Sequence, residues 1–433
     1  MTKELRGYTL TLTEAAEALA ERQLTALQLA ETQLARVRTT DAAVCAWETL
    51  DSDHVRREAA RWDATHPPRP LGGIGIGVKD IIDTADLPTT IGSPIFADRR
   101  PASDAVCVAR LRAAGAFVFG KTVTTPFAFM DPGKTRNPWD PAHTPGGSSS
   151  GSAAAVAVGH VNAALGTQTN GSVIRPAALC GIVGFKPTLN AIPTAGVQAF
   201  SESFDTVGTF TRTVEDAARL ASALADPGRI AATLVPFARP PRFAYIGDFP
   251  WTVQDCAADD VVEAAVTQLR TRAEVVPLAL PPAWHEAKSI MRTIMLFEAA
   301  RNLGDLQSRE RARMSPAVNA GLDEGRAITS AAYGAARDER ERAIAFFTQW
   351  FESFDAVLAP SAPGPAPRGL GTTGDPSCCT LWSLLGFPAI SLPVGLAQRL
   401  PVGLQLAAPA GHDDSLLAAA AWCGARLSFR GLV

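Results

Sequence analysis

Apolar positions along the chain follow two rhythms. In some stretches they recur every three or four residues, which predicts amphipathic helices; in others they form short continuous runs, which predict buried strands. Residues 11–61 show the first rhythm, with a stripe formed by Leu24, Leu27, Leu34 and Val37. We expect this region to be helical and the stripe to pack on the protein's own core, because most amphipathic helices direct their apolar face there.

Strand and helix patterns alternate through the rest of the chain. Residues 74–78 and 116–120 predict strands, and residues 104–115 predict the helix between them. Residues 360–376 are rich in Pro and Gly and predict a long loop of the kind that often carries function. The other expected elements are strands at 242–246, 275–280, 389–394 and 402–407 and helices at 259–271, within 285–350, and at 413–426. This mixture predicts an α/β protein.

The densest cluster of small residues lies between positions 144 and 188. It contains a Gly/Ser-rich loop with Ser148, an Ala/Val run, and a second small-residue loop that ends at Ser172. Such loops can turn several backbone N–H groups toward one point, as is needed to hold an oxyanion during acyl transfer. A serine nucleophile also needs a base, and none of the six histidines lies in either loop. Lys79, at the end of the strand at 74–78, is the alternative base, because burial lowers the pKa of a lysine.

Two shorter motifs compete with this interpretation. Residues 115–122 match the phosphate-binding pattern GxxxxGK[ST], but the four middle residues are those of a strand rather than a loop, so we do not expect ATP binding. Residues 147–151 match GxSxG, which would make Ser149 the nucleophile. That motif requires a strand directly before it, and the Pro-containing residues 137–145 cannot form a central strand.

Several segments together resemble the amidase signature family. They are residues 78–80, 89–93, 111–116, 120–122, 145–188, 204–208, 355–360, 386–389 and 401–405. The resemblance runs from about residue 10 to 425 and is weakest between about 228 and 350. It implies one compact domain, residues 1–433, with a large mixed β-sheet surrounded by helices.

The resemblance also divides this domain into parts. It implies N-terminal helices at about 11–61, a catalytic core at about 70–225 and 355–425, and a variable region at about 228–350 that helps to wall the substrate pocket. Candidate pocket residues in the variable region are Met291, Met295, Leu296 and Phe297.

The catalytic residues follow from the same resemblance. Ser172 matches the family's nucleophile, Ser148 matches the bridging serine that follows a cis peptide bond, and Lys79 matches the base. In this interpretation Lys79 takes a proton from Ser148, which takes one from Ser172. The oxyanion is expected to be held by consecutive backbone N–H groups, those of Thr169, Asn170, Gly171 and Ser172.

Two residues near Ser172 bear on the substrate. Asn170 stands where the family usually has a glycine, and Asn tolerates unusual backbone angles better than most residues. Arg175 matches an arginine that binds a substrate carboxylate in the malonamidase-like branch, a task that a guanidinium performs well. The alternative is a structural Arg175 that pairs with a buried carboxylate or with backbone carbonyls.

The resemblance implies a serine hydrolase that cleaves C–N bonds of small amides, anilides or carbamates (urethanes) through an acyl-enzyme. The implied branches of the family are malonamidase-like, aryl acylamidase and urethanase-like. Esterase activity is expected as an additional activity. Two alternatives stay open: the glutaminase (A) subunit of a tRNA-dependent amidotransferase, and a catalytically silent binding module. The tyrosine-rich stretch usual in the glutaminase protein has no counterpart, because the only tyrosines are Tyr8, Tyr245 and Tyr333. The filled triad positions argue against a silent module.

Composition and charge limit the kinds of binding partner that we expect. The 433 residues carry a net charge of −3 without a basic block, so we expect neither nucleic acid nor a membrane surface as a partner. The seven cysteines are scattered without a CxxC pair, so we expect reduced thiols, no metal and a cytoplasmic protein. The N-terminus lacks a leader pattern, and no apolar run is long enough for a membrane span. We expect no cofactor, a small amide or carbamate and water as reactants, and a homodimer as one open oligomeric state.

Overall fold

Eleven strands of one sheet are found in the described residues, 7–65 and 68–433, of this computed structural model. The strands are β1 (Trp47–Thr49), β2 (Gly75–Lys79), β3 (Phe117–Thr122), β4 (Ala164–Gln168), β5 (Val183–Lys186), β6 (Thr206–Thr211), β7 (Arg242–Tyr245), β8 (Glu274–Pro277), β9 (Ala356–Pro360), β10 (Ala389–Ala397) and β11 (Leu400–Ala407). Their order across the sheet is β1-β3-β2-β4-β6-β5-β10-β11-β9-β7-β8.

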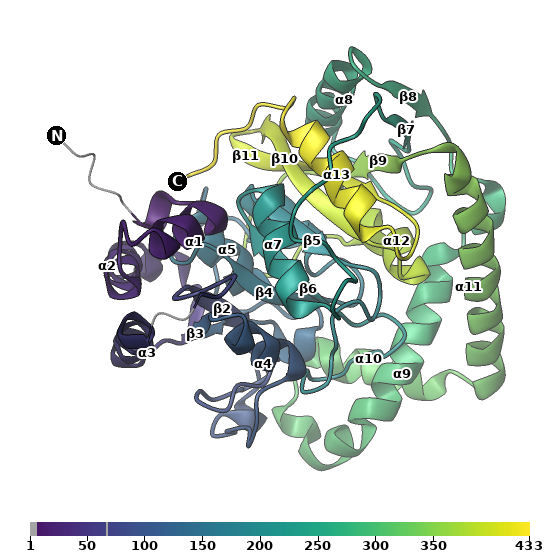
Figure 1. The fold of residues 1–433 in the computed structure, drawn as a ribbon. Helices are drawn as coiled ribbons and strands as arrows, with labels where there is room; N and C mark the ends of the chain where they lie inside the picture. The colour runs from purple at the N-terminus through teal and green to yellow at the C-terminus, as the bar shows by residue number, and fades with distance from the viewer. Residues whose placement is uncertain (1–6, 66–67) are drawn as a thin grey trace.

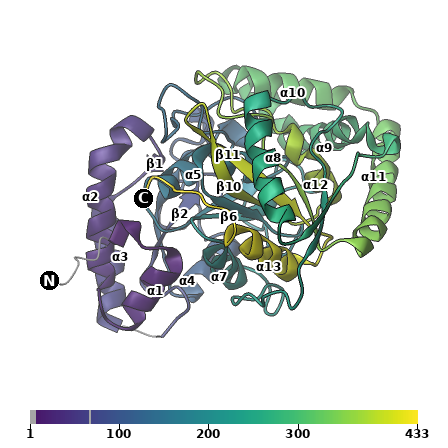
Figure 2. The same cartoon turned by 90° about the horizontal axis from the view of Figure 1, so that it is seen from above.

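Thirteen α-helices surround this sheet within the described ranges (Figure 1). They are α1 (Leu12–Ala20), α2 (Ala26–Val44), α3 (Ser52–Thr65), α4 (Val106–Ala113), α5 (Ser150–Ala157), α6 (Ile174–Cys180), α7 (Val214–Leu224), α8 (Cys256–Arg270), α9 (Ala287–Glu310), α10 (Pro316–Ala327), α11 (Ser330–Trp350), α12 (Thr380–Leu385) and α13 (Asp413–Gly424). Helices α1–α3 and α9–α11 lie at opposite ends of the molecule in both views (Figures 1 and 2).

The sheet is mixed, which confirms the predicted α/β fold of a single domain. β2 pairs in parallel with β3 and β4, and β7 pairs in parallel with β8 and β9. The other neighbours are antiparallel. Every residue of β2 is buried, as is typical of a strand covered on both faces. The strand predicted at 74–78 is found as β2, whose last residue, Lys79, lies in the interior.

The N-terminal region departs from the all-helical expectation for residues 11–61. It contains the strand β1, which pairs antiparallel with β3 at the sheet's edge. Three residues are too few to display a period of two, so the strand is stabilised by its partner rather than by its own pattern. Helices α1 and α2 begin at capping boxes formed by Thr11 with Glu14 and by Thr25 with Gln28.

Helix α5 packs closely against the β1–β3 edge because of one glycine. A Cβ atom at Gly151 would lie 2.3 Å from the carbonyl oxygen of Ala46 and 2.4 Å from the backbone nitrogen of Val123. Any other residue would push α5 outward. The close approach keeps the loop that precedes α5, with Ser148, beside the end of β2.

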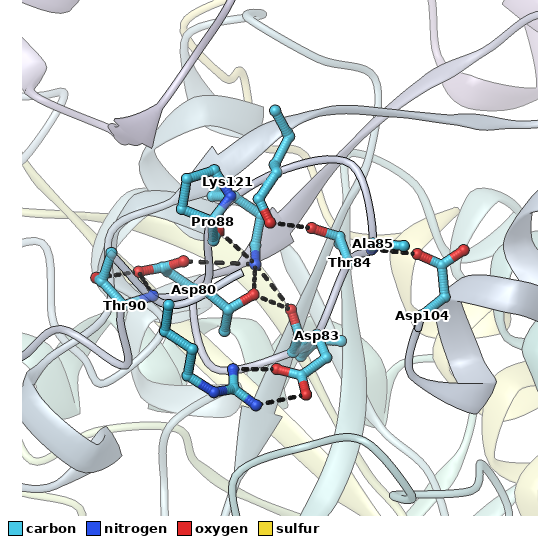
Figure 3. A network of polar contacts seen from close by, with 12 residues as sticks. Asp80, Asp83, Thr84, Ala85, Pro88, Thr90, Asp104 and Lys121 are labelled. Atoms are coloured by element: carbon cyan, nitrogen blue, oxygen red, sulfur yellow. Dashed lines mark hydrogen bonds and ion pairs between the residues drawn. The ribbon is translucent and has the colours of Figure 1, made fainter. Parts of the chain in front are cut away.

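Lys121, the lysine of the phosphate-binding pattern, takes part in a network of polar contacts inside the protein (Figure 3). Lys121 lies within β3, fully buried, so the middle of the pattern is a strand, as expected. Its Nζ donates to the carbonyls of Ile82 (2.8 Å) and Pro88 (3.2 Å) and to Thr89 Oγ1 (2.5 Å), and lies 3.4 Å from the carboxylate of Asp80. Lys121 therefore fixes the loop that follows Lys79.

Two of the remaining expectations concern membranes and the N-terminus. Of the helices that the described residues form, none combines the length and apolarity needed to cross a bilayer. The N-terminal stretch expected to lack a leader includes residues 1–6, which lie outside the described residues.

Candidate active site

Lys79 ends β2 in a fully buried position beside Ser148. Its Nζ is hydrogen-bonded to Ser148 Oγ at 2.7 Å and donates to Thr167 Oγ1 at 2.8 Å. Burial lowers the pKa of Lys79 well below its ordinary value; the Asp205 carboxylate opposes this shift and the Arg175 cation adds to it. A neutral amine at this distance is able to accept the proton of the Ser148 hydroxyl.

The loop that carries Ser148 is tightly held. The Gly147–Ser148 peptide bond is cis, in agreement with the resemblance. The backbone N–H of Thr125 donates to the Ser148 carbonyl (3.2 Å), and Arg175 Nη2 donates to the Gly147 carbonyl (2.6 Å). A Cβ atom at Gly147 would lie 2.8 Å from Thr373 Cγ2, so the Gly147 backbone is also packed against Thr373.

Ser149, which the GxSxG pattern would make the nucleophile, is occupied elsewhere. Its side chain is fully buried and donates to the Thr167 carbonyl (3.1 Å), and its Oγ accepts from the Thr167 N–H (3.2 Å). No strand is found at residues 137–145, all of which are described. The structural context that GxSxG requires is therefore missing.

Ser172 lies two residues before the start of α6 and lines a cavity of about 300 Å³. Ser172 is 8% exposed, more than Lys79 or Ser148. Gln168 fixes the start of α6, because its Oε1 accepts from the N–H groups of Val173 (2.8 Å) and Ile174 (3.0 Å). Among the described residues no hydrogen bond joins Ser172 to Ser148, so only the lysine half of the predicted relay is connected here.

The loop before Ser172 is fixed at Thr169 and Asn170. Thr169 Oγ1 donates to Asp205 Oδ1 at 2.6 Å. The side-chain oxygen of Asn170 accepts from Thr380 Oγ1 (3.2 Å), and the backbone carbonyl of Asn170 accepts from Ser383 Oγ. Both donors belong to α12. The Asn170 amide therefore contacts α12.

The two positions before Ser172 have different steric requirements. Asn170 is not among the described residues with positive φ, so it does not use the backbone freedom that we expected it to need. At Gly171 a Cβ atom would lie 2.8 Å from Pro376 Cβ and 3.3 Å from Cys379 Sγ. Of positions 170 and 171, only position 171 sterically requires a glycine here.

Arg175 joins three segments of the site. Besides Gly147, it donates to the Gly374 carbonyl (3.1 Å) and to Thr373 Oγ1 (3.2 Å), while its Nε has no partner among the described residues. Burial lowers the pKa of Arg175 to about 10, which still leaves it charged at neutral pH. Two of its three acceptors are backbone carbonyls, as in the structural alternative for this residue.

The cavity around Ser172 is lined by both apolar and charged side chains. Met291 and Met295 of α9 line it, as expected. The two other candidates do not: Leu296 is buried in the core of the described protein, and Phe297 stacks on Tyr333 with ring centroids 4.2 Å apart. The remaining lining residues are Ala128, Phe129, Met130, Thr169, Asn170, Gly171, Arg175, Phe200, Lys288, Arg292, Thr373, Gly374, Asp375, Pro376 and Thr380.

Asp205, Thr167 and Gln168 escaped the sequence interpretation. Asp205 Oδ2 accepts from the N–H groups of Phe200 (2.7 Å) and Ser201 (2.9 Å), and burial raises its pKa to about 6. Its only signal was its place in the segment 204–208. Thr167 and Gln168 lie in the small-residue run itself, but their partners come from distant segments. In the described ranges no group of three His, Cys, Asp or Glu side chains gathers as a metal site would require.

Comparisons with known proteins agree with this fold. The amidase family profile matches residues 28–417. The A component of the glutamyl-tRNA(Gln) amidotransferase from Roseiflexus castenholzii is 35% identical over 462 aligned positions, covering 95% of this chain and 94% of that protein. A solved amidase structure has a TM-score of 0.88 at 31% identity and covers 97% of this chain and 100% of its own. The native peptide amidase from Stenotrophomonas maltophilia has a TM-score of 0.86 at 28% identity and covers 98% of each chain. Because the profile spans most of the sequence, this protein belongs to the amidase family.

Proposed function

We propose that this protein is a serine hydrolase that cleaves the C–N bond of small amides, including anilides, through an acyl-enzyme on Ser172. The observation that carries the proposal is the buried amine of Lys79, 2.7 Å from Ser148 Oγ, in a site whose cavity is lined by Ser172. Burial favours the neutral form of the Lys79 amine, which is the form that can act as the base that the serines otherwise lack.

The proposed reaction moves one proton along the three side chains. Neutral Lys79 accepts the proton of Ser148, Ser148 accepts that of Ser172, and Ser172 Oγ attacks the carbonyl carbon. The resulting oxyanion is held by the backbone N–H groups of residues 169–172. When the C–N bond breaks, the proton returns to the leaving amine. Water then attacks the acyl-enzyme along the same route, which releases the acid and restores Ser172.

The proposal requires Ser172 to turn toward Ser148 once a substrate fills the cavity. Such tightening is common, because catalytic hydrogen bonds in free enzymes are often incomplete and form only with substrate present. The two supporting hydroxyls, Ser148 and Thr167, already flank the lysine amine.

The cavity limits the substrate class. Its volume of about 300 Å³ and its walls of Phe129, Phe200, Met291 and Met295 suit a compact aliphatic or aromatic amide. We assign Arg175 a holding role, because its Nη groups donate to acceptors of the 147 and 373–374 segments. Aryl carbamates and esters present the same type of carbonyl and are proposed as secondary substrates.

Glutamine hydrolysis within an amidotransferase complex is the second candidate. The similarity to the glutamyl-tRNA(Gln) amidotransferase component, at 35% identity across 95% of this chain, favours it. That function would make glutamine the amide donor and would require partner proteins and tRNA. The apolar cavity wall and Met130, 55% exposed at the cavity, favour a less polar substrate.

A matched substrate panel tests the proposal. It contains a neutral anilide, the same anilide with a terminal carboxylate, the matching aryl carbamate, and L-glutamine, each with wild type and Ser172→Ala. We expect the isolated chain to hydrolyse the neutral anilide faster than glutamine, and Ser172→Ala to be inactive on all four. Glutamine as the preferred substrate, with activity that rises on adding a co-purified partner, would favour the second candidate. Failure of wild type on every substrate and with a serine-directed probe would support a silent module.

A further inference from the structure

The segment 200–205 connects the loop before Ser172 to the variable helices. Asp205 at its end accepts from Thr169 Oγ1 through one oxygen and from the N–H groups of Phe200 and Ser201 through the other. The carboxylate thus closes the segment into a turn and attaches that turn to Thr169. A shift of the turn would therefore move the first residue of the proposed oxyanion loop.

Glu298 of α9 holds this turn from the other side. Its Oε2 accepts from Ser201 Oγ (2.6 Å) and the Ser203 N–H (3.0 Å), and its Oε1 accepts from Ser203 Oγ (2.6 Å) and the Tyr333 hydroxyl (2.8 Å). Glu298 is 2% exposed. Burial alone would raise the pKa of Glu298, but the hydrogen bonds outweigh it and lower the pKa, so the carboxylate is charged at neutral pH.

Further donors from α9 and α11 reach the same turn. Asn302 Nδ2 donates to the Phe200 carbonyl (3.3 Å), and Arg340 Nη2 donates to the Ser203 carbonyl (3.1 Å). Arg340 also lies over the ring of Phe204, 5.2 Å from its centroid. Glu298 is distinguished from these by contacting side-chain and backbone donors at two positions of the turn at once.

Helix α9 is also a wall of the catalytic cavity. Met291 and Met295 lie about two turns and one turn before Glu298, so residues on neighbouring turns of one helix serve the cavity and the anchor. Phe200, at the start of the turn, lines the same cavity and stacks on Phe129 with centroids 5.0 Å apart. Fixing the turn to α9 therefore fixes two walls of the cavity relative to each other.

We propose that Glu298 is a positioning residue for the proposed acyl transfer. It holds the 200–205 turn so that Asp205 keeps Thr169 in place, and it sets the α9 wall relative to Ser172. This inference rests on the proposed function. It implies that the variable helices influence rate as well as substrate choice, although no residue of α9 takes part in the proton relay.

A matched pair of variants on α9 tests the proposal. Glu298→Gln keeps the size of the side chain but replaces one acceptor oxygen by a donor amide, so that the donors on that side lose their partner. The control is Gln307→Ala, because Gln307 is equally buried on α9 but bonds to Asn319 and Asp323 of α10 instead. The readouts are kcat and KM on the neutral anilide, the melting temperature, and amide hydrogen exchange.

We expect Glu298→Gln to lower kcat about tenfold or more with KM within about threefold, since loss of positioning acts on the transition state. We also expect faster amide exchange at residues 169–172 and 200–205. Gln307→Ala should lower the melting temperature to a similar extent without either effect. A kcat for Glu298→Gln within about threefold of wild type, or activity losses that follow melting temperature equally in both variants, would overturn the proposal.

Amide hydrogen exchange also tests the positioning role of Glu298 separately from the proposed function. If wild type hydrolyses none of the amides, the proposed function fails, and unchanged exchange at 169–172 in Glu298→Gln would overturn the positioning role as well. If Glu298→Gln does not fold, Ser203→Ala removes one donor from outside the helix and should produce the same changes at smaller amplitude. Unaltered kcat and exchange in Ser203→Ala would then contradict the proposal.

Discussion

The amine of Lys79 lies 2.7 Å from the hydroxyl oxygen of Ser148, with both side chains withdrawn from solvent. The lysine belongs to the end of a central strand and the serine to the loop before α5, and a glycine at 151 lets that helix approach closely enough to bring them together. The pair places a base of lowered pKa next to a serine, in the candidate site whose cavity is lined by Ser172.

The Lys79–Ser148 pair predicts a hydrolysis rate that rises with pH. The buried Lys79 must be neutral to act as a base, and its pKa is lowered, so activity should be lost on acidification as Lys79 becomes protonated and should reach a plateau below the pKa of an ordinary lysine. The measurement is kcat/KM on the neutral anilide between pH 6 and 9. A rate that falls as pH rises over that range would argue against a neutral lysine as the base.

Lys79→Met should separate activity from stability. It removes the base and should lower kcat by about 10³-fold or more, in the upper part of the range for general-base catalysis. Because the folded state lowers the lysine pKa, the unfolded state binds the proton more tightly, and this linkage opposes folding below the unfolded pKa and fades as pH rises toward it. Methionine abolishes this cost, so thermal unfolding at pH 7 should show a higher melting temperature than wild type. A variant that is both active and less stable would contradict the assignment.

Arg175→Met should affect neutral and carboxylate-bearing anilides equally. Its guanidinium holds Gly147 and the 373–374 segment, so its loss should disturb the Ser148 loop whatever the substrate, with an expected fall in kcat of about 10²-fold. The ratio of kcat/KM values for the two anilides is the decisive quantity. A selective loss of about tenfold or more for the carboxylate-bearing anilide would instead make Arg175 a carboxylate ligand.

The two positions before Ser172 should respond differently to alanine. Gly171→Ala places a Cβ atom 2.8 Å from Pro376 Cβ, which must displace the proposed oxyanion loop, so we expect kcat to fall about 10²-fold. Asn170→Ala needs no positive φ and should keep kcat within about fivefold while losing the contact with Thr380. Initial rates of the two purified variants provide the test, and equal losses in both would contradict the steric argument.

Local sequence predicted several residues that the fold brings together at the candidate site, but not the residues that support them. Ser148, Ser172 and the strand that ends at Lys79 lie in runs of small or apolar residues that are recognisable on their own. The partners of Thr169 and Gly147 could not be predicted, because Asp205 and Thr373 reach them only through the sheet order and the long loop after β9. Strand β1 was missed for the related reason that its pairing with β3, rather than its own pattern, defines it.

Lys121→Met should destabilise the fold. The substitution leaves the buried Asp80 carboxylate without its cation. It also leaves three acceptors in the loop that follows Lys79 without their donor. Removing one partner of a buried ion pair costs about 3–5 kcal/mol, which denaturant unfolding can resolve. Asp80→Asn added to Lys121→Met should recover part of the loss. A change below about 1 kcal/mol in the single variant would show that the network of Figure 3 contributes little.

The central claim, that Ser172 becomes acylated with the help of Ser148 and Lys79, is tested most directly by intact-mass spectrometry of the enzyme quenched during turnover of an activated aryl ester or anilide. The proposal predicts an adduct of one acyl group on wild type that maps to the peptide containing Ser172. It also predicts no adduct on Ser172→Ala and strongly slowed acylation in Ser148→Ala and Lys79→Met. An adduct that persists in Ser172→Ala, or acylation of Lys79→Met at the wild-type rate, would contradict the account.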